Sequence, residues 1–196
     1  MQTEMTQQEV RMAAELEIEV KKPYAPKQLP LRYWPDSVLS EPCIPVAEIN
    51  EGIRHLAMDM LLTMMKSGGI GLAAPQVGQR LRIFVADVNY FKGHNQARPY
   101  VFINPAIVPL GANEVDGPEG CLSFPNTSVT VKRAEQVLVR ATDMDGNQFE
   151  LDAVGLMARV VQHENDHLNG VTINPHLGRY ARNELRKGLK QVARRR

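Results

Sequence analysis

The residues best suited to chemistry lie in one short run, His163-Glu-Asn-Asp-His167. In a helix, side chains four positions apart lie on the same face, so the two imidazoles can reach one metal ion. Glu164, between them, can meet a water molecule on that ion and take its proton. The spacing therefore predicts a metal site with two histidine ligands and a base, in preference to two histidines that form only ordinary hydrogen bonds.

The third metal ligand must come from elsewhere, because open catalytic sites usually have three protein ligands. Glu184 follows His167 at a spacing that a zinc protease can use, but it lies in a basic tail. Cys121 is the better candidate. It lies within Glu119-Gly-Cys-Leu-Ser-Phe-Pro125, where the preceding glycine allows close backbone approach and a strand-like setting can aim a thiolate. The other cysteine, Cys43, is expected to be a buried, inert thiol.

Three motifs follow one another along the chain: Gly69-Ile-Gly-Leu-Ala-Ala-Pro-Gln76, Glu119-Gly-Cys-Leu-Ser123 and Gln162-His-Glu-Asn-Asp-His167. Together they closely resemble the motifs of the peptide deformylases. These enzymes remove the N-formyl group from the N-terminal formylmethionine of newly made bacterial and organellar proteins. The resemblance covers about residues 30 to 175.

The resemblance implies a metal centre with Cys121, His163 and His167 as ligands and Glu164 as general acid and base. A metal-bound water would attack the formyl carbon of an N-formylmethionyl peptide, and formate would be released. Members of the family work best with Fe(II), which nickel, cobalt or zinc often replaces in preparations. The ligand chemistry agrees, since a thiolate suits iron or zinc better than magnesium.

The same resemblance assigns roles to residues around the metal. The developing oxyanion would be held by the Gln76 side chain and the Leu122 backbone N–H. Glu119 and Arg133 would form a salt bridge behind the ligand loop. The residues that would border the substrate are Ile70, Gly71 and Val160. Gly71 would offer backbone hydrogen bonds, and the apolar side chains would line a methionine pocket.

Periodicity predicts the elements that must position these residues. Apolar residues recur at spacings of three and four from Ile49 to Met64, which predicts a helix with one buried stripe that ends at Gly68-Gly69. The glycine-rich run 69–78 is predicted as a loop, and a second helix is predicted from Gly155 to about Leu168. Strands are predicted at 81–88, 102–108, 127–142 and 148–152. The pattern indicates an α+β fold. With the resemblance, the expected architecture is antiparallel sheets around the histidine-bearing helix, with further helices near the N-terminus and the C-terminus.

Length and composition fit one globular domain with distinct ends. Residues 1–28 are predicted as an extension that can be flexible, 29–176 as the catalytic domain and 177–196 as a basic C-terminal helix. The two cysteines give no disulfide framework, which indicates a reducing compartment. The acidic start has no apolar stretch for a secretory signal, and no later run is long enough to span a membrane. A cytoplasmic protein without a membrane partner is therefore expected.

The basic tail predicts an anionic partner. Arg179, Arg182, Arg186 and Lys190 recur at spacings of three and four, which gathers their charges on one helical face. In some deformylases a C-terminal helix docks on the ribosome, so ribosome contact is expected here. The alternative is a helix that only packs against the domain and keeps it in solution.

Two other functions stay open on the sequence. One is a zinc metallopeptidase that uses His163, His167 and Glu184 as ligands. The other is a protein without enzymatic activity that binds RNA through the basic tail.

Overall fold

The computed structural model describes residues 24–90, 96–179, 183 and 187 of the chain. The helices and 3-10 turns are η1 (Ser37–Ser40), α2 (Glu51–Lys66), η2 (Ala74–Val77), α3 (Leu156–Leu168) and η5 (Asn174–His176). The strands are β1 (Gly71–Ala73), β2 (Ile83–Ala86), β3 (Tyr100–Pro109), β4 (Glu114–Cys121), β5 (Phe124–Ala134), β6 (Gln136–Thr142) and β7 (Gln148–Val154).

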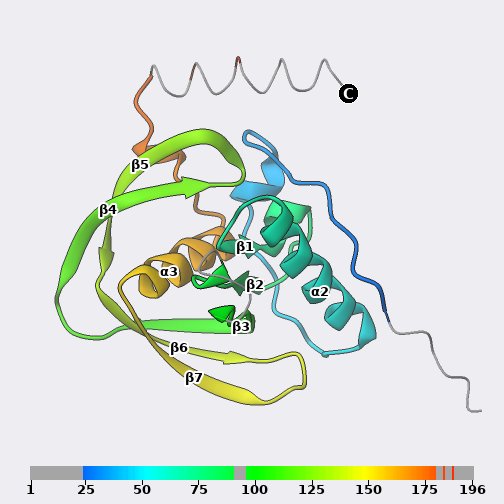
Figure 1. Ribbon diagram of the computed structural model, residues 1–196. Helices are drawn as coiled ribbons and strands as arrows, with labels where there is room; N and C mark the ends of the chain where they lie inside the picture. Colours follow the sequence, from blue (N-terminus) through cyan, green and yellow to red (C-terminus); the bar gives the residue numbers. More distant parts are fainter. Residues whose placement is uncertain (1–23, 91–95, 180–182, 184–186, 188–196) are drawn as a thin grey trace, which may run out of the picture.

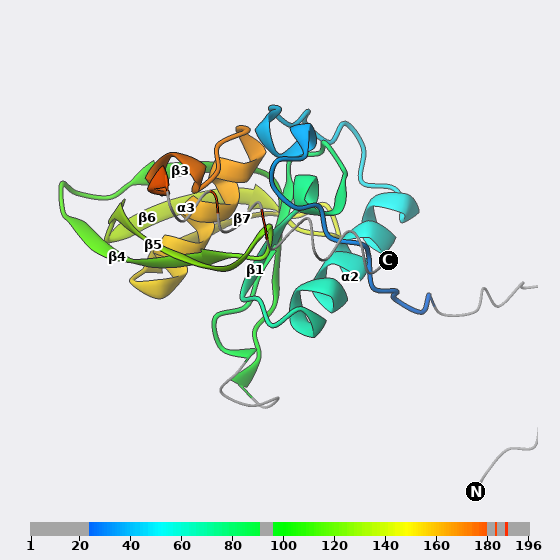
Figure 2. The same ribbon diagram turned by 90° about the horizontal axis from the view of Figure 1, so that it is seen from above.

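The strands form two antiparallel sheets. One has five strands in the order β1-β2-β3-β6-β7, and the other consists of β4 and β5. Figure 1 shows α3 enclosed between the two sheets, with α2 on the other side of strands β1 to β3. Figure 2 shows the same arrangement from above, with the paired strands β4 and β5 extending past α3. The predicted α+β fold with antiparallel sheets around the histidine-bearing helix is confirmed.

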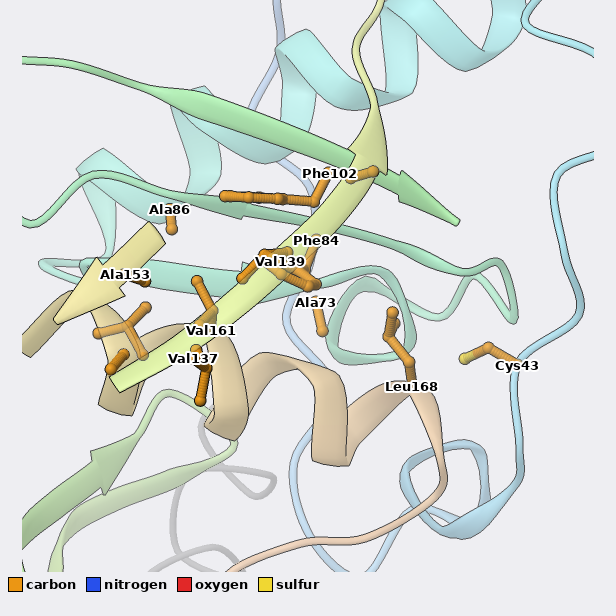
Figure 3. Packing of buried hydrophobic residues seen from close by; sticks show 13 residues of the cluster. Cys43, Ala73, Phe84, Ala86, Phe102, Val137, Val139, Ala153, Val161 and Leu168 are labelled. Carbon is orange, nitrogen blue, oxygen red and sulfur yellow. The ribbon is translucent and has the colours of Figure 1, made fainter. Parts of the chain in front are cut away.

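Strand β2 shows why the five-stranded sheet needs a helix on each face. Successive side chains of a strand point to opposite faces, and all four residues of β2 are buried. Phe84 belongs to the apolar cluster that contains α3, while Ile83 belongs to the cluster that contains α2. Figure 3 shows Val161 and Leu168 of the first cluster on the side of the sheet where Phe84 lies. Burying a valine, leucine or phenylalanine side chain stabilises the fold by about 1.5–3 kcal/mol.

Both long helices begin and end close to the predicted residues. Helix α2 begins after Asn50, whose side chain accepts a hydrogen bond from the Ile53 backbone, and it ends before Gly68, which has a φ of 73°. Its methionines Met60 and Met64 are completely buried, as the predicted buried stripe requires. Helix α3 runs from Leu156 to Leu168, as predicted to within one residue.

The strand predictions were less complete. The run 69–78, predicted as a loop, contains β1 and η2, and the predicted strand 127–142 is two strands, β5 and β6, that meet at Glu135. Strand β4 was not predicted. Most of its side chains are exposed on both faces, so the sequence lacks the apolar alternation that marks a half-buried strand.

The segment that precedes η1 lies along α2. The Asp59 carboxylate accepts hydrogen bonds from the Tyr24 hydroxyl at 2.9 Å and from the Lys27 backbone at 2.7 Å. The Thr63 hydroxyl accepts one from the Leu29 backbone at 2.8 Å. The predicted division of the chain into an extension, a catalytic domain and a tail stays a prediction, and these contacts indicate that the domain begins a few residues before position 28.

The C-terminal helix was predicted for residues that lie mostly outside the described part of the chain. The described positions in this stretch, Arg179, Asn183 and Lys187, are exposed and have helical backbone. Within the described residues, no helix is long and apolar enough to cross a bilayer.

Candidate metal centre

The three side chains that were predicted as metal ligands lie together where α3 faces the end of β4. The ligand atoms of Cys121, His163 and His167 are all within 4.8 Å of one another. Cys121 Sγ lies 3.2 Å from His167 Nε2. The two histidines are one helical turn apart, which directs both rings to the same side of α3. The alternative ligand Glu184 lies outside the described residues.

The turn from β4 into β5 positions the cysteine. The β4–β5 register shifts between Gly120 and Cys121, after which Cys121 pairs directly with Phe124. Irregularities of this kind often redirect a side chain at the end of a strand. The glycine before the cysteine is not needed for close approach, contrary to expectation: a Cβ on Gly120 would meet the Thr127 carbonyl oxygen at 3.6 Å, an ordinary contact.

Glu119 orients the first histidine. Its Oε2 accepts a hydrogen bond from His163 Nδ1 at 2.9 Å, which leaves Nε2 for a metal. The predicted salt bridge to Arg133 is confirmed, with Nε and Nη2 at 2.8 and 3.0 Å from the two carboxylate oxygens. Burial raises the pKa of Glu119, but His163 and Arg133 outweigh it and lower the pKa to about 2. The carboxylate is therefore charged and acts as an acceptor throughout the neutral range.

Arg159 is a part of the site that the sequence interpretation missed. It lies one turn before His163, and its Nη1 donates to Glu119 at 3.0 Å and to the Val131 carbonyl at 2.7 Å. Its Nη2 donates to the Val115 carbonyl at 2.8 Å. The guanidinium thus ties α3, which carries the two histidines, to both strands of the small sheet, one of which ends at Cys121. Arg159 lies four positions before His163 and so on the same face of the helix, and this spacing could have indicated its place in the site.

The protonation of the histidines fits a cation at this position. Burial lowers the pKa of His167 well below its ordinary value, so this imidazole is neutral, as a metal ligand must be. Burial also lowers the pKa of His163, but hydrogen bonds to Cys121 and Glu119 outweigh it and raise the pKa. The surroundings of His163 therefore favour positive charge beside Cys121. One thiol and two imidazoles form a donor set for a first-row divalent ion and not for magnesium.

Glu164 lies against the backbone of β1. A Cβ on Gly71 would collide with the Glu164 carboxylate and would come within 2.9 Å of Val160 Cγ1, so only a glycine leaves the carboxylate in this place. Among the residues that the structure describes, Glu164 Oε2 has no hydrogen-bond partner although it is buried. Burial raises the pKa of Glu164 to about 7. A carboxyl group with this pKa can accept and release a proton near neutral pH, and a neighbouring cation lowers the value.

A cavity of about 1230 Å³ opens beside these residues. The site residues predicted from the sequence that line it are Ile70, Gly71, Gln76, Cys121, Leu122, Val160, His163 and Glu164. Residues 28–31 and Lys66 also line it, at the N-terminal segment and the end of α2. The structure thus brings the predicted residues to one place, while their separate roles stay predictions. The volume exceeds what most small-molecule ligands require, which leaves room for a peptide.

Gln76 is held beside Cys121 in a fixed orientation. Its Oε1 accepts a hydrogen bond from the Ala73 backbone at 2.8 Å, and because an N–H can only donate, this contact identifies the oxygen of the amide. Nε2 then lies 3.4 Å from Cys121 Sγ and 3.3 Å from Ser123 Oγ. The amide nitrogen, a donor, is therefore the Gln76 atom that faces the Cys121 sulfur.

An α+β fold in which an HExxH helix and a cysteine at the end of a strand meet beside one cavity defines a metal-dependent hydrolase. The family model described as polypeptide deformylase matches residues 28–183. Peptide deformylase 1 of Clostridium perfringens is 44% identical over 146 residues, which are 74% of this chain and 95% of that protein. The chain therefore belongs to the peptide deformylase family.

Solved structures agree with this assignment. The crystal structure of peptide deformylase from Ehrlichia chaffeensis has a TM-score of 0.77 and 34% identity, and the match covers 85% of this chain and 97% of that one. A crystal structure of the class I type b peptide deformylase from Acinetobacter baumannii with bound Met-Ala-Ser has a TM-score of 0.70 and 31% identity, covering 78% and 100%. The chain is thus an enzyme of the deformylase type.

Proposed function

We propose that this enzyme hydrolyses the formamide bond of N-terminal formylmethionine on nascent proteins and releases formate. The observation that carries this proposal is the meeting of three ligand atoms, a buried carboxyl group and an amide donor beside one cavity. The relative from Acinetobacter baumannii binds Met-Ala-Ser, the peptide that deformylation of formyl-Met-Ala-Ser leaves behind. The room in the cavity beyond the predicted methionine pocket suits such a peptide.

Cys121, His163 and His167 would hold one divalent ion. When bound, the ion supplies a Lewis acid, which lowers the pKa of a bound water to about 7. Fe(II) is the metal that we favour, and nickel, cobalt or zinc can take its place because all of them accept sulfur and nitrogen ligands.

Glu164 would move the proton. It takes one from the water that attacks the formyl carbon and delivers one to the amine nitrogen as the C–N bond breaks, so that formate and a free amine leave. Its position against Gly71 supports this role, because the glycine backbone lets the carboxylate lie at the edge of the cavity.

Gln76 and Leu122 would stabilise the charge that develops on the formyl oxygen. The Gln76 Nε2 beside Cys121 is suitably placed for one hydrogen bond, and the Leu122 backbone N–H would give the second. Each preorganised donor is worth about 3 kcal/mol in comparable sites. Ile70 and Val160 would border the methionine side chain, and Gly71 would offer backbone hydrogen bonds to the substrate.

A formate assay tests the proposal. Protein that has been loaded anaerobically with Fe(II) is incubated with formyl-Met-Ala-Ser and, separately, with a longer peptide that has no formyl group. We expect formate and Met-Ala-Ser from the first peptide and no cleavage of the second. Cleavage of internal bonds without formate would instead support a metallopeptidase.

We further propose that the basic tail contacts the ribosome, where formylated chains emerge. The support lies in the sequence, in the spacing of Arg179, Arg182, Arg186 and Lys190. Binding through phosphates weakens steeply with added salt. Truncation after residue 178 should reduce co-sedimentation with ribosomes and spare turnover of free formyl peptides. Equal sedimentation of full-length and truncated protein at low salt would refute the contact.

A further inference from the structure

The amide of Gln76 is fixed by contacts inside the protein. Gln76 is 1% exposed, and Ser123, in the turn between β4 and β5, is completely buried. Ala73 donates to Gln76 Oε1, and Gln76 Nε2 faces Ser123 Oγ at 3.3 Å and Cys121 Sγ at 3.4 Å. An amide has two N–H groups in one plane. Once Ser123 accepts one of them, the other has a single direction, toward Cys121.

The two acceptors differ in strength. A serine hydroxyl is an ordinary acceptor, whereas sulfur is a weak one. A carbonyl oxygen that enters the cavity beside Cys121 can therefore replace the sulfur as the partner of its N–H. Ser123 keeps the other N–H, because its side chain is not exposed and water does not compete for it.

The backbones of Gln76 and Ser123 are both hydrogen-bonded to the same short segment of chain. The Arg32 N–H donates to the Gln76 carbonyl at 2.8 Å, and the Trp34 N–H donates to the Ser123 carbonyl at 3.1 Å. The donors are two positions apart in one short segment, so a single stretch of chain bridges η2 and the turn between β4 and β5. The contact between the Gln76 amide and the Ser123 hydroxyl is therefore supported by backbone hydrogen bonds on both sides.

We propose that Ser123 is a positioning residue for Gln76: its hydroxyl accepts one N–H and thereby aims the other at the place of the substrate's formyl oxygen. This inference rests on the proposed deformylation for the identity of that oxygen. The orientation of the Gln76 amide in the free protein does not depend on the reaction.

The first test is an NMR measurement on the metal-free protein. The two side-chain N–H signals of Gln76 are identified in an ¹⁵N spectrum by their loss in Gln76→Leu. In the wild-type protein we expect two well-separated signals that exchange slowly with solvent. Ser123→Ala should bring the signals together and speed their exchange at least tenfold. Unchanged signals in Ser123→Ala would overturn the proposal.

The second test is a double-mutant cycle with formyl-Met-Ala-Ser. Ser123→Ala should lower kcat about tenfold with KM within about twofold, a fraction of the 10²–10³ that a whole oxyanion donor contributes. In a Gln76→Leu background, the same change should have no further effect. A tenfold loss in both backgrounds would show that Ser123 acts through another group, and no loss in either would also overturn the proposal.

Thr142→Val is the control. It removes a half-buried hydroxyl on β6, and Thr142 does not line the cavity, so kcat should not change. A kcat loss in the control equal to that in Ser123→Ala would assign both losses to general destabilisation and overturn the positioning role. If the wild-type protein released no formate, the proposed function would fail, and the NMR measurement would still decide how the amide is held.

Discussion

Replacing Glu119 by glutamine should weaken both the fold and metal binding. The Glu119 side chain accepts hydrogen bonds from Arg133, Arg159 and His163 and is only 4% exposed, so the change leaves two guanidinium groups that are little exposed against a neutral amide. Removing one partner of a buried charged pair costs about 3–5 kcal/mol. Glutamine keeps an acceptor oxygen, so we expect a value near the lower limit, about 3 kcal/mol. For a protein of this length that corresponds to a fall in Tm of about 6–12 °C.

The same change should loosen the metal site. Loss of a carboxylate that orients a histidine ligand typically lowers metal affinity by about 10–100-fold. Thermal unfolding followed by circular dichroism gives the stability, and competition with a chelator gives the affinity for Zn(II) or Co(II). The Tm values should be compared for the metal-free proteins, because a bound ion stabilises the fold and weaker metal binding would by itself lower the Tm.

The matched control for this experiment is Glu150→Gln. Glu150 pairs with Arg140 at 2.7 Å, as short as the Glu119 contacts, but the two side chains are 58% and 61% exposed. Exposed pairs contribute less than about 1 kcal/mol because water screens them. The control should leave metal affinity unchanged. If Glu119→Gln behaved like the control in both measurements, the view that Glu119 supports the metal site would be wrong.

Three further changes test other parts of the site. Glu164→Gln should keep the metal and lower kcat by about 10²–10⁴, as expected for loss of a general acid and base, and undiminished formate release would remove the proposed base. Gly71→Ala should lower kcat by about 10² without unfolding the protein, because the added methyl group displaces the Glu164 carboxylate; steady-state kinetics check this, and normal kcat would contradict the close contact. The Fe(II) enzyme should lose activity in air faster than the Ni(II) enzyme, because iron and Cys121 can both be oxidised; equal half-lives would argue against iron as the working metal.

The parts of the site that depend on local periodicity were predictable. His163 and His167 share a face of α3 because four positions make about one turn, and the apolar stripe of α2 followed from the same rule. Cys121 was found by its motif and not by any local pattern. A thiol at the end of a strand has no periodicity that distinguishes a ligand from a buried core residue.

The contacts that support the site could not be predicted from local patterns, because they join distant positions. Arg159 is 40 positions from Glu119, and Ser123 is 47 positions from Gln76. A charged residue on a helix usually indicates a solvated face. The Arg159 side chain is only 11% exposed here because backbone carbonyls of β4 and β5 accept its hydrogen bonds, and β4 itself gave no signal in the sequence.

The identity of the three metal ligands is the central claim, and X-ray absorption spectroscopy of the zinc-loaded protein tests it most directly. With Cys121, His163 and His167 as ligands, the spectrum should show one sulfur at about 2.3 Å and two imidazole nitrogens at about 2.0–2.1 Å from the metal. Cys121→Ser should remove the sulfur signal. A first shell of nitrogen and oxygen alone in the wild-type protein would contradict the proposed ligands and favour a site that uses Glu184.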